Sequence, residues 1–275
     1  MAEAILDANA IAQWIGRTPE GWLHVLPTVD STNDYAKMLA LQNAPKGTAV
    51  LAEQQTNGRG RMGRSFQSPM GQGIYLSYLL RPRCQAEELM DLTCLVAVAV
   101  CQAMEETLDF RPGIKWINDL VWGGRKLAGI LTEMSLEPGS GLVRYCIVGI
   151  GINCSQSRQD FPPELQDIAV SLQTILDRPI HRERLVAAVL LALEKLDNLT
   201  PEERRAMMRR YRRDCVTIGK AVRVIRAGES RDGVALEMAD DGALVVDFEG
   251  TVERVQSGEV SVRGFFGYTD CGENG

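Results

Sequence analysis

The sequence predicts an α+β protein, in which a core of mixed helices and strands is followed by a small β domain. Up to about residue 214, stretches with helical apolar spacing alternate with short strand-like runs. Beyond Asp214, apolar and polar residues alternate in short segments separated by glycine-containing turns. The length of 275 residues suits one larger and one smaller domain, which we expect at 1–214 and 215–275.

Helices and strands are expected in turn along the larger domain. A short amphipathic helix is predicted at 5–16 and a second at 34–44, where Ser31 or Thr32 supplies the N-cap. The segment 86–108 is apolar nearly all round, which predicts a long buried helix. Strands are expected at 22–29, 47–53, 74–80, 115–122, 127–135 and 143–153.

The connections and the C-terminal region complete this outline. Gly123-Gly124 predicts a turn that joins two strands into a hairpin. Segment 164–213 is expected to be mostly helical, and its basic stretch Arg204–Arg213 is either a solvated helix face or a docking surface for an acidic partner. Residues 216–263 predict four or five short strands in a barrel-like domain, and 264–275 are expected to be a tail.

The composition excludes several classes of protein. Lys and Arg total 30 against 36 Asp and Glu, and the net charge of −6 argues against bulk binding to DNA or anionic lipid. The longest uncharged apolar stretch, 92–104, is too short for a bilayer-spanning helix of about 20 residues. The N-terminus has an acid at Glu3 and no basic segment, so it does not resemble a signal peptide. We therefore expect a chain that binds neither DNA nor a membrane.

Cysteine and histidine exclude further chemistry. None of the seven cysteines forms a C-x-x-C pair, so neither a zinc ribbon nor a thioredoxin-like motif is expected. An odd number of cysteines in a chain of this size argues against a disulfide framework and favours a reducing, cytoplasmic setting. The two histidines, His24 and His181, lie in no recognisable catalytic motif.

The most unusual segment is G-R-G-R-M-G-R at 58–64, which lies in a predicted loop at 58–73. Its glycines allow sharp turns and close approach of a ligand to backbone N–H groups. Its arginines grip phosphate or carboxylate, so the segment predicts a flexible clamp for an anionic substrate, with a solvated basic loop as the alternative. It also matches G-x-G-x-x-G, but Pro69, Gly71 and Gly73 follow in place of a helix, which argues against a dinucleotide-binding fold.

Two further clusters place polar groups on predicted strands. Asn118 and Asp119 interrupt the strand at K-W-I-N-D, where they could bind a phosphate with its metal or a ribose, or simply form a turn. Lys126 follows the hairpin turn and could point into the same pocket or be solvated. The glycines of V-G-I-G-I-N at 148–153 indicate close approach by a ligand or by another backbone, and Asn153 ends that strand.

Together and in this order, the motifs resemble those of the biotin–protein ligase family. They are D-S-T-N at 30–33, A-E-Q-Q-T-N-G-R-G-R-M-G-R at 52–64, K-W-I-N-D at 115–119, G-R-K-L-A-G-I-L-T-E at 124–133 and V-G-I-G-I-N at 148–153. A weaker match to the family, S-G-E-V-S-V-R-G, lies at 257–264, at the end of the small domain. The resemblance implies a class II tRNA-synthetase-like mixed sheet and an SH3-like C-terminal β-barrel.

The resemblance also implies an activity. Members of the family activate biotin with ATP and Mg²⁺ to biotinyl-5′-AMP, releasing pyrophosphate, and pass the biotinyl group to a lysine of a carrier domain such as that of acetyl-CoA carboxylase. This chemistry needs positioning and positive charge more than acid or base catalysis, which suits a basic cluster without histidine. A mobile glycine-rich loop could also shield the mixed anhydride from water.

Roles carry over residue by residue from this resemblance. Catalytic roles are implied for Lys126, Arg59, Arg61 and Asp119, and Asp119 is our candidate for orienting the acceptor lysine. The implied biotin contacts are Ser31, Thr32, Asn33, Gln55, Arg59, Gly60, Arg61, Lys126 and Gly129. The implied ATP contacts are Gly58, Arg61, Arg64, Phe66, Asn118 and Asn153, and Mg²⁺ is expected with the ATP, near Asp119 and Asn153.

Two positions depart from the family's pattern. Ile117 stands where the K-W-P-N-D motif has proline, which alters the strand end but removes no ligand. Phe66 stands where the family often has tryptophan, so an aromatic wall is kept and an indole N–H is lost. Neither change undermines the expected activity.

Three other functions are to be distinguished from a simple ligase. Some members also repress transcription through an N-terminal winged-helix domain, but the roughly thirty residues before Ser31 are too few for one, so we expect a monofunctional ligase, either monomeric or homodimeric. A lipoate ligase or octanoyl transferase shares the core, although the G-R-G-R-M-G-R loop and the Ser-Thr-Asn wall favour biotin. A noncatalytic biotin sensor would not need Lys126 together with Asn118, Asp119 and Asn153.

Overall fold

A seven-stranded mixed sheet dominates the computed structural model, which describes residues 5–226, 228–256 and 260–264. The strand order is β1-β2-β3-β7-β6-β5-β4, in which β1 runs parallel to β2 and the other neighbours are antiparallel. The strands are β1 (Leu23–Val29), β2 (Ala49–Gln55), β3 (Gly73–Leu80), β4 (Gly113–Lys115), β5 (Asp119–Trp122), β6 (Arg125–Leu136) and β7 (Val143–Asn153). The predicted mixed sheet is thereby confirmed.

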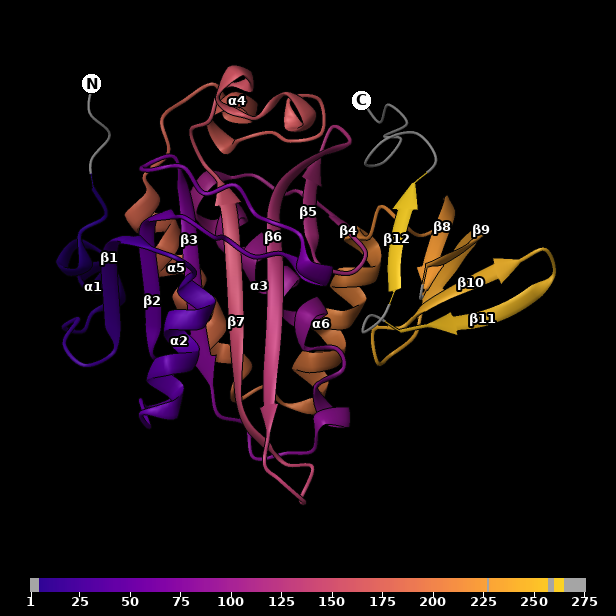
Figure 1. Ribbon diagram of the computed structural model, residues 1–275, viewed down its shortest axis with the longest axis horizontal. Coiled ribbons are helices and arrows are strands. Elements are labelled where there is room, and N and C mark those ends of the chain that lie inside the picture. The colour runs from indigo at the N-terminus through magenta and orange to yellow at the C-terminus, as the bar shows by residue number, and fades with distance from the viewer. Residues whose placement is uncertain (1–4, 227, 257–259, 265–275) are drawn as a thin grey trace.

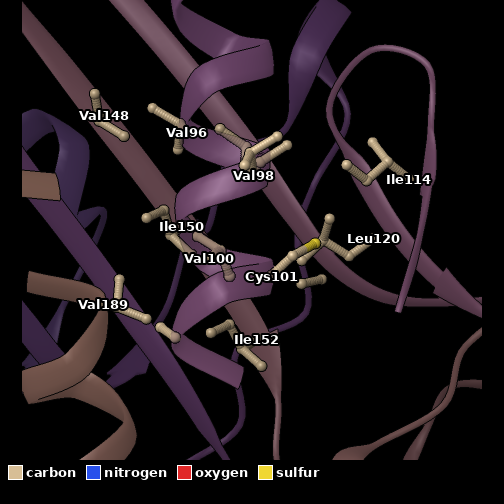
Figure 2. Packing of buried hydrophobic residues seen from close by; sticks show 14 of the residues in the cluster. Val96, Val98, Val100, Cys101, Ile114, Leu120, Val148, Ile150, Ile152 and Val189 are labelled. Carbon is tan, nitrogen blue, oxygen red and sulfur yellow. The ribbon is translucent and has the colours of Figure 1, made fainter. Parts of the chain in front are cut away.

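Helices cover both faces of this sheet. They are α1 (Ala8–Ile15), α2 (Thr32–Leu41), α3 (Leu92–Leu108), α4 (Leu172–Leu176), α5 (Arg182–Leu196) and α6 (Pro201–Asp214). Figure 1 shows α2 in front of the sheet and α3, α5 and α6 behind it. The valines of α3 lie against the apolar face of β7, as Figure 2 shows for Val96, Val98, Val100, Val148, Ile150 and Ile152. Since α3 is buried nearly throughout, its almost wholly apolar sequence is explained.

Local sequence signals explain where several elements begin and turn. Ser31 is the N-cap of α2, since its hydroxyl accepts from the N–H of Asp34 at 3.5 Å, and Thr32 is the first helical residue. Thr200 and Glu203 form a capping box at the start of α6. Both residues of Gly123-Gly124 have positive φ, 53° and 71°, which confirms the predicted hairpin turn between β5 and β6.

One predicted boundary differs clearly from the structure, and two predictions about interrupted segments can be compared with it. Helix α3 starts at 92 rather than 86, because 86–89 form a separate 3-10 turn and the Asp91 carboxylate is held by Arg204 of α6 (Oδ2–Nε 2.7 Å). The region 164–213 is mostly helical, as predicted, and contains α4, α5 and α6; Pro179 disfavours helical backbone before it and lies in the loop between α4 and α5. The interruption predicted at Asn118 and Asp119 is present, but it lies slightly earlier, at 116–118, where the chain turns between β4 and β5.

The basic stretch of α6 is only partly a solvated face. The side chains of Arg205, Arg209 and Arg213 are exposed. The other three dock α6 onto neighbouring elements through the ion pairs Arg204–Asp91, Arg210–Glu105 and Arg212–Asp240. Docking of an acidic partner on this face stays a prediction.

A second, five-stranded antiparallel sheet follows α6. Its strands are β8 (Ala221–Arg226), β9 (Glu229–Met238), β10 (Leu244–Phe248), β11 (Thr251–Val255) and β12 (Val260–Gly264), in the order β11-β10-β9-β8-β12. The small β domain is confirmed, while its SH3-like character and the boundary at 214 and 215 stay predictions. Ala227, the turn at Ser257-Gly258 and the tail at 265–275 with Cys271 lie outside the described residues.

The expectations about membrane-spanning helices and about disulfides can be compared with the described residues. Among their helices, none has the length and the apolar character that crossing a membrane requires. The six cysteines among them are free thiols. Burial raises the pKa of Cys101 and of Cys146 to about 12, so these thiols pack as apolar groups.

A buried ion pair joins three elements of the larger domain. Arg182, at the start of α5, donates to Glu53 of β2 (Nη1–Oε2 2.9 Å) and to the carbonyl oxygen of Gly73 at the start of β3 (3.0 Å). The two side chains are only 8% and 2% exposed. Each charge therefore depends on the other for compensation.

Replacing this arginine should destabilise the protein strongly. Arg182→Met leaves the Glu53 carboxylate buried without its counter-charge, so the free energy of unfolding should fall by about 3–5 kcal/mol. Urea denaturation measures the change. The control is Arg223→Met, which removes an exposed pair with Asp232 and should leave the midpoint unchanged. Equal shifts in the two variants would contradict the prediction.

Candidate active site

The face of the large sheet that carries α2 holds a cavity of about 580 Å³, lined by residues of β6, β7, the N-terminus of α2 and the loop that follows β2. Fourteen of the fifteen site residues predicted from the sequence line it. They are Ser31, Thr32, Asn33, Gln55, Arg59, Gly60, Arg61, Arg64, Phe66, Asn118, Asp119, Lys126, Gly129 and Asn153. The fold thus brings together residues that are far apart in the sequence, and only Gly58 of the predicted set is not among the lining residues.

Strand β7 separates this cavity from the core by the alternation of its side chains. Val148, Ile150 and Ile152 face α3 (Figure 2), so Gly149 and Gly151, which alternate with them, lie on the opposite face, towards the cavity. A Cβ on Gly149 would lie 2.2 Å from Oδ1 of Asn33, and one on Gly151 would lie 2.5 Å from the ring of Phe66. The glycines therefore make room for two side chains of the cavity wall.

A hydrogen-bonded polar wall forms one side of the cavity. Oε1 of Gln55 accepts from the N–H and the hydroxyl of Thr32 at 2.9 and 3.0 Å, and its Nε2 donates to Oγ of Ser68 at 2.9 Å. Buried Ser77 of β3 donates to Oδ1 of Asn33 at 2.6 Å and lies 2.8 Å from the Thr32 hydroxyl. The wall presents neutral donors and acceptors in fixed positions, which suits an amide-like or urea-like group.

Residues 58–64, which we name the arginine loop, are more ordered than the predicted irregular loop. Arg59 forms a β-bridge with Ser65, and the N–H of Gly60 donates to the carbonyl of Arg64 at 2.7 Å. The tip is a 3-10 turn, Arg61–Gly63. The loop is therefore a short hairpin whose arginines line the cavity.

Gly58, the first residue of the arginine loop, lies in close contact with residues that follow the hairpin. A Cβ at Gly58 would lie 2.4 Å from the carbonyl oxygen of Phe66 and 2.7 Å from Oγ of Ser68. The carbonyl of Gly58 also accepts from the N–H of Phe66 at 2.8 Å. The structure thus gives Gly58 a place in the fold of the loop, while its predicted contact with ATP has no support from the cavity lining.

Positive charge dominates the cavity. Of the described residues that line it, five are basic and one is acidic: Arg59, Arg61, Arg64, Lys115, Lys126 and Asp119. Nζ of Lys126 lies 2.7 Å from Oδ1 of Asp119 and 5.8 Å from the centre of the Phe66 ring. Burial lowers the pKa of Arg61, although the Asp119 carboxylate opposes that effect. This charge distribution favours an anionic ligand.

Asn118 and Asn153 brace the walls of the cavity. Asn118 accepts from Arg61 at 3.3 Å and donates through Nδ2 to the carbonyl of Ile130 at 2.9 Å. Nδ2 of Asn153 donates to the carbonyl of Val170 at 3.2 Å. The predicted contacts of both asparagines with the nucleotide or Mg²⁺ stay predictions, to which the structure adds these bracing bonds.

Two parts of the site were not among the predicted site residues: an apolar wall of the cavity, and Ser77, which bonds to the polar wall. Phe161, Leu165, Ile168 and Ala169 cover one side. Their segment is attached to β6 by backbone bonds between Lys126 and Ile168 (2.7 Å) and between Val170 and Lys126 (2.9 Å). No local pattern marks these apolar residues as cavity-lining. Ser77 did give a signal, because it is the one small polar residue among the large apolar and aromatic residues of the strand I-Y-L-S-Y-L-L.

Trp116 connects the cavity to the second sheet. Its backbone N–H donates to Oγ1 of Thr217, and its indole N–H donates to the carbonyl of Gly242, both at 2.9 Å. The peptide bond between Trp116 and Ile117 is cis, at the position where the K-W-P-N-D pattern has proline. Because Trp116 also lines the cavity, the C-terminal sheet supports a cavity wall.

The contact between β7 and Asn33 can be tested by overpacking. Gly149→Ala should lower the free energy of unfolding by about 1–3 kcal/mol, because the new methyl group meets the Asn33 amide. The double variant Gly149→Ala/Asn33→Ala should recover part of this loss, since the methyl group then has room. Thermal unfolding of the ligand-free protein measures both. Simple addition of the two single losses in the double variant would contradict this account.

Comparisons with known proteins agree with the motifs and the geometry. The model of the Biotin/lipoate A/B protein ligase family matches residues 25–153. The Bifunctional ligase/repressor BirA of Bacillus subtilis is 37% identical over 240 residues, which cover 85% of this chain and 72% of that protein. The Biotin–[acetyl-CoA-carboxylase] ligase of Mycobacterium tuberculosis is 30% identical over 267 residues, which cover 93% of this chain and 95% of that protein.

A solved structure agrees as well. The biotin protein ligase from Aquifex aeolicus in complex with biotin and ATP superposes with a TM-score of 0.74 at 29% identity. The superposition covers 88% of this chain and 99% of that chain. On the sequence relatives and this shared fold, the chain belongs to the biotin–protein ligase family.

Proposed function

We propose that the chain is an ATP-dependent biotin–protein ligase that biotinylates a lysine of a carrier domain such as the biotin carboxyl carrier of acetyl-CoA carboxylase. The observation that carries the proposal is a single cavity in which a neutral polar wall is combined with five basic side chains. The wall suits the ureido ring of biotin, and the basic side chains suit a carboxylate and a triphosphate. The names of the relatives and the solved complex with biotin and ATP support the same activity.

The first step joins two anions. An oxygen of the biotin carboxylate attacks the α-phosphorus of ATP, the bond to the β-phosphate breaks, and pyrophosphate leaves biotinyl-5′-AMP behind. Lys126, Arg59 and Arg61 neutralise the carboxylate and the α-phosphate, which would otherwise repel each other. Ser31 and Gly60 lie with the polar wall and the arginine loop around biotin. Gly129 allows close packing, since a Cβ there would lie 3.0 Å from Nζ of Lys126.

ATP binds beside this centre with its magnesium ion. Arg64, Phe66 and Asn118 are the proposed nucleotide contacts, with Asn153 at the end of β7. The described residues include no group of three or more His, Cys, Asp or Glu side chains that could hold a metal alone. Asp119 and Asn153 are the residues that would hold Mg²⁺ together with the phosphates of ATP, and the ion would supply positive charge to neutralise them.

The second step transfers the biotinyl group. The acceptor lysine nitrogen attacks the carbonyl carbon of biotinyl-5′-AMP, the bond to the AMP oxygen breaks, and AMP leaves as the amide forms. The attacking amine must lose a proton, and Asp119 is proposed to orient it and to receive that proton. The arginine loop excludes water from the mixed anhydride until the carrier arrives.

Further properties of the chain belong to the same proposal. A reducing, cytoplasmic setting fits its cysteines, and its acidic charge fits a chain that binds no DNA. The chain acts as a monomer or a homodimer. Lipoate ligation and noncatalytic biotin sensing are the competing functions, and the next experiment separates them.

Biotin-dependent release of pyrophosphate from ATP and Mg²⁺ should identify the substrate. Release is expected with biotin but not with lipoate or octanoate. Lys126→Ala and Arg61→Ala should each slow it about 100-fold or more, because both cations stabilise the reacting anions. Lys195→Ala, an exposed lysine on α5, is the control and should not change the rate. Tight biotin binding without any release would favour the sensor, and release with lipoate alone would favour the lipoate ligase.

Asp119 should be needed when the biotinyl group is transferred. Asp119→Asn keeps the shape of the side chain but removes the base, so transfer from preformed biotinyl-5′-AMP to a carrier domain should slow at least about 100-fold. Single-turnover transfer, which bypasses ATP, measures this step alone. An unchanged rate would show that Asp119 acts only in the first step, through its ion pair with Lys126.

A further inference from the structure

Outside the cavity lies a line of charged side chains that we name the charged bridge: Asp34, Lys37 and Glu133. Asp34 and Lys37 belong to α2, and Glu133 belongs to β6. Nζ of Lys37 lies 3.3 Å from Oδ1 of Asp34 and 2.6 Å from Oε1 of Glu133. None of the three is among the residues that line the cavity, so a direct contact with substrate is not their role.

The two ends of the charged bridge reach two different walls of the cavity. At one end, Oδ2 of Asp34 lies 2.7 Å from Nη2 of Arg59 in the arginine loop. At the other end, Oε2 of Glu133 accepts from Nδ2 of Asn33 in the polar wall at 2.7 Å. The loop above the cavity and the wall beneath it are therefore joined by a continuous set of charge-assisted contacts.

The end at Asn33 fixes the orientation of an amide. Ser77 donates to its Oδ1, and Glu133 accepts from its Nδ2; because a carboxylate can only accept, Glu133 determines which of the two amide atoms faces it. Glu133 itself is held by Lys37. Although burial opposes the change, the hydrogen bonds and charges of Glu133 and Asp34 raise the pKa of Lys37, so this lysine stays charged between two carboxylates.

The end at Arg59 holds a loop that projects from the sheet. The side chain of Arg59 is 47% exposed, so the cavity wall alone does not fix it. The opposite side of the loop is tied to the sheet by the bond from Arg61 to Asn118. Asp34 therefore supplies an anchor on the α2 side, and the loop spans the cavity between the two attachments.

We propose that Asp34, Lys37 and Glu133 are positioning residues that hold the arginine loop closed over the cavity and couple its closure to the orientation of Asn33. The ligand that they help to retain is the biotinyl-5′-AMP of the proposed function, on which this part rests. The loop contact itself exists without a ligand. A contact between partly exposed charges should be modest in strength and weakened by salt.

Tryptic cleavage of the ligand-free protein tests the loop contact without relying on any activity. Trypsin cuts after arginine, and the arginine loop offers three such sites. Asp34→Asn should speed cleavage within 58–64 about two- to fivefold, the range expected for a partly exposed ion pair. Asp34→Glu should restore most of the protection. Raising the salt concentration should speed cleavage of the parent protein and have little effect on Asp34→Asn.

Two control variants make the result specific. Asp232→Asn removes a carboxylate from an exposed pair on the second sheet and should leave loop cleavage unchanged. The double variant Asp34→Asn/Glu133→Gln should change cleavage by less than the product of the single effects, because both act through Lys37. Cleavage of Asp34→Asn at the parental rate, or an equal effect of Asp232→Asn, would overturn the proposal.

A second measurement tests the consequence for catalysis. Asp34→Asn should release biotinyl-5′-AMP about two- to fivefold faster and raise the KM for biotin by a similar factor, with kcat unchanged within about twofold. Loss of kcat at an unchanged KM would contradict a positioning role. If the chain forms no adenylate, the proposed function fails, and the cleavage experiment still decides whether the charged bridge holds the loop.

Discussion

The alternation of side chains along β7 is the constraint on which the rest of the structure depends. This central strand buries one face against α3, and on its other face it packs Tyr145 and Ile147 against α2 and leaves space for a cavity at its end. Valine and isoleucine on one side provide the apolar contact, and Gly149 and Gly151 on the other side provide the space. A side chain at either glycine would displace Asn33 or Phe66, so the core and the candidate site are specified by the same eleven-residue strand.

The chemistry of the cavity follows from what the strands and loops bring to it. The described residues that line the site include five basic side chains, one carboxylate and no histidine. Such a site is poorly suited to general base catalysis, but it is well suited to bringing two anions together. The polar wall supplies the complementary function, since its hydroxyls and amides are already bonded to one another and need little reorganisation when a ligand binds.

Much of this could be predicted from the sequence because the signals are local. The sequence predicts the strand 143–153 with its observed ends, since it is a mainly apolar run in which glycines alternate with apolar residues at 148–152. The hairpin at Gly123-Gly124 and the cap at Ser31 follow from turn and capping chemistry. Fourteen of the fifteen predicted site residues line one cavity, and all of these except Phe66 belong to motifs that could be identified in the sequence.

The features that sequence reasoning missed depend on contacts between distant segments. The shortened start of α3 reflects a bond from Asp91 to Arg204, which no window around residue 90 contains. The apolar wall at 161–169 is identified only by the backbone bonds that bring it to β6. The contacts of the charged bridge likewise cannot be predicted from the sequence, because Glu133 lies about a hundred positions from Asn33.

The two hydrogen bonds that Trp116 donates restrict how far the two parts of such a protein can change independently. The indole and backbone N–H groups of this buried residue find their acceptors on Gly242, between β9 and β10, and on Thr217, just before β8. A chimera that joins this core to the C-terminal region of a relative must supply a carbonyl and a hydroxyl at the same places, or two donors are left buried without acceptors. The two hydrogen bonds of Trp116 therefore limit which C-terminal sheets could replace this one.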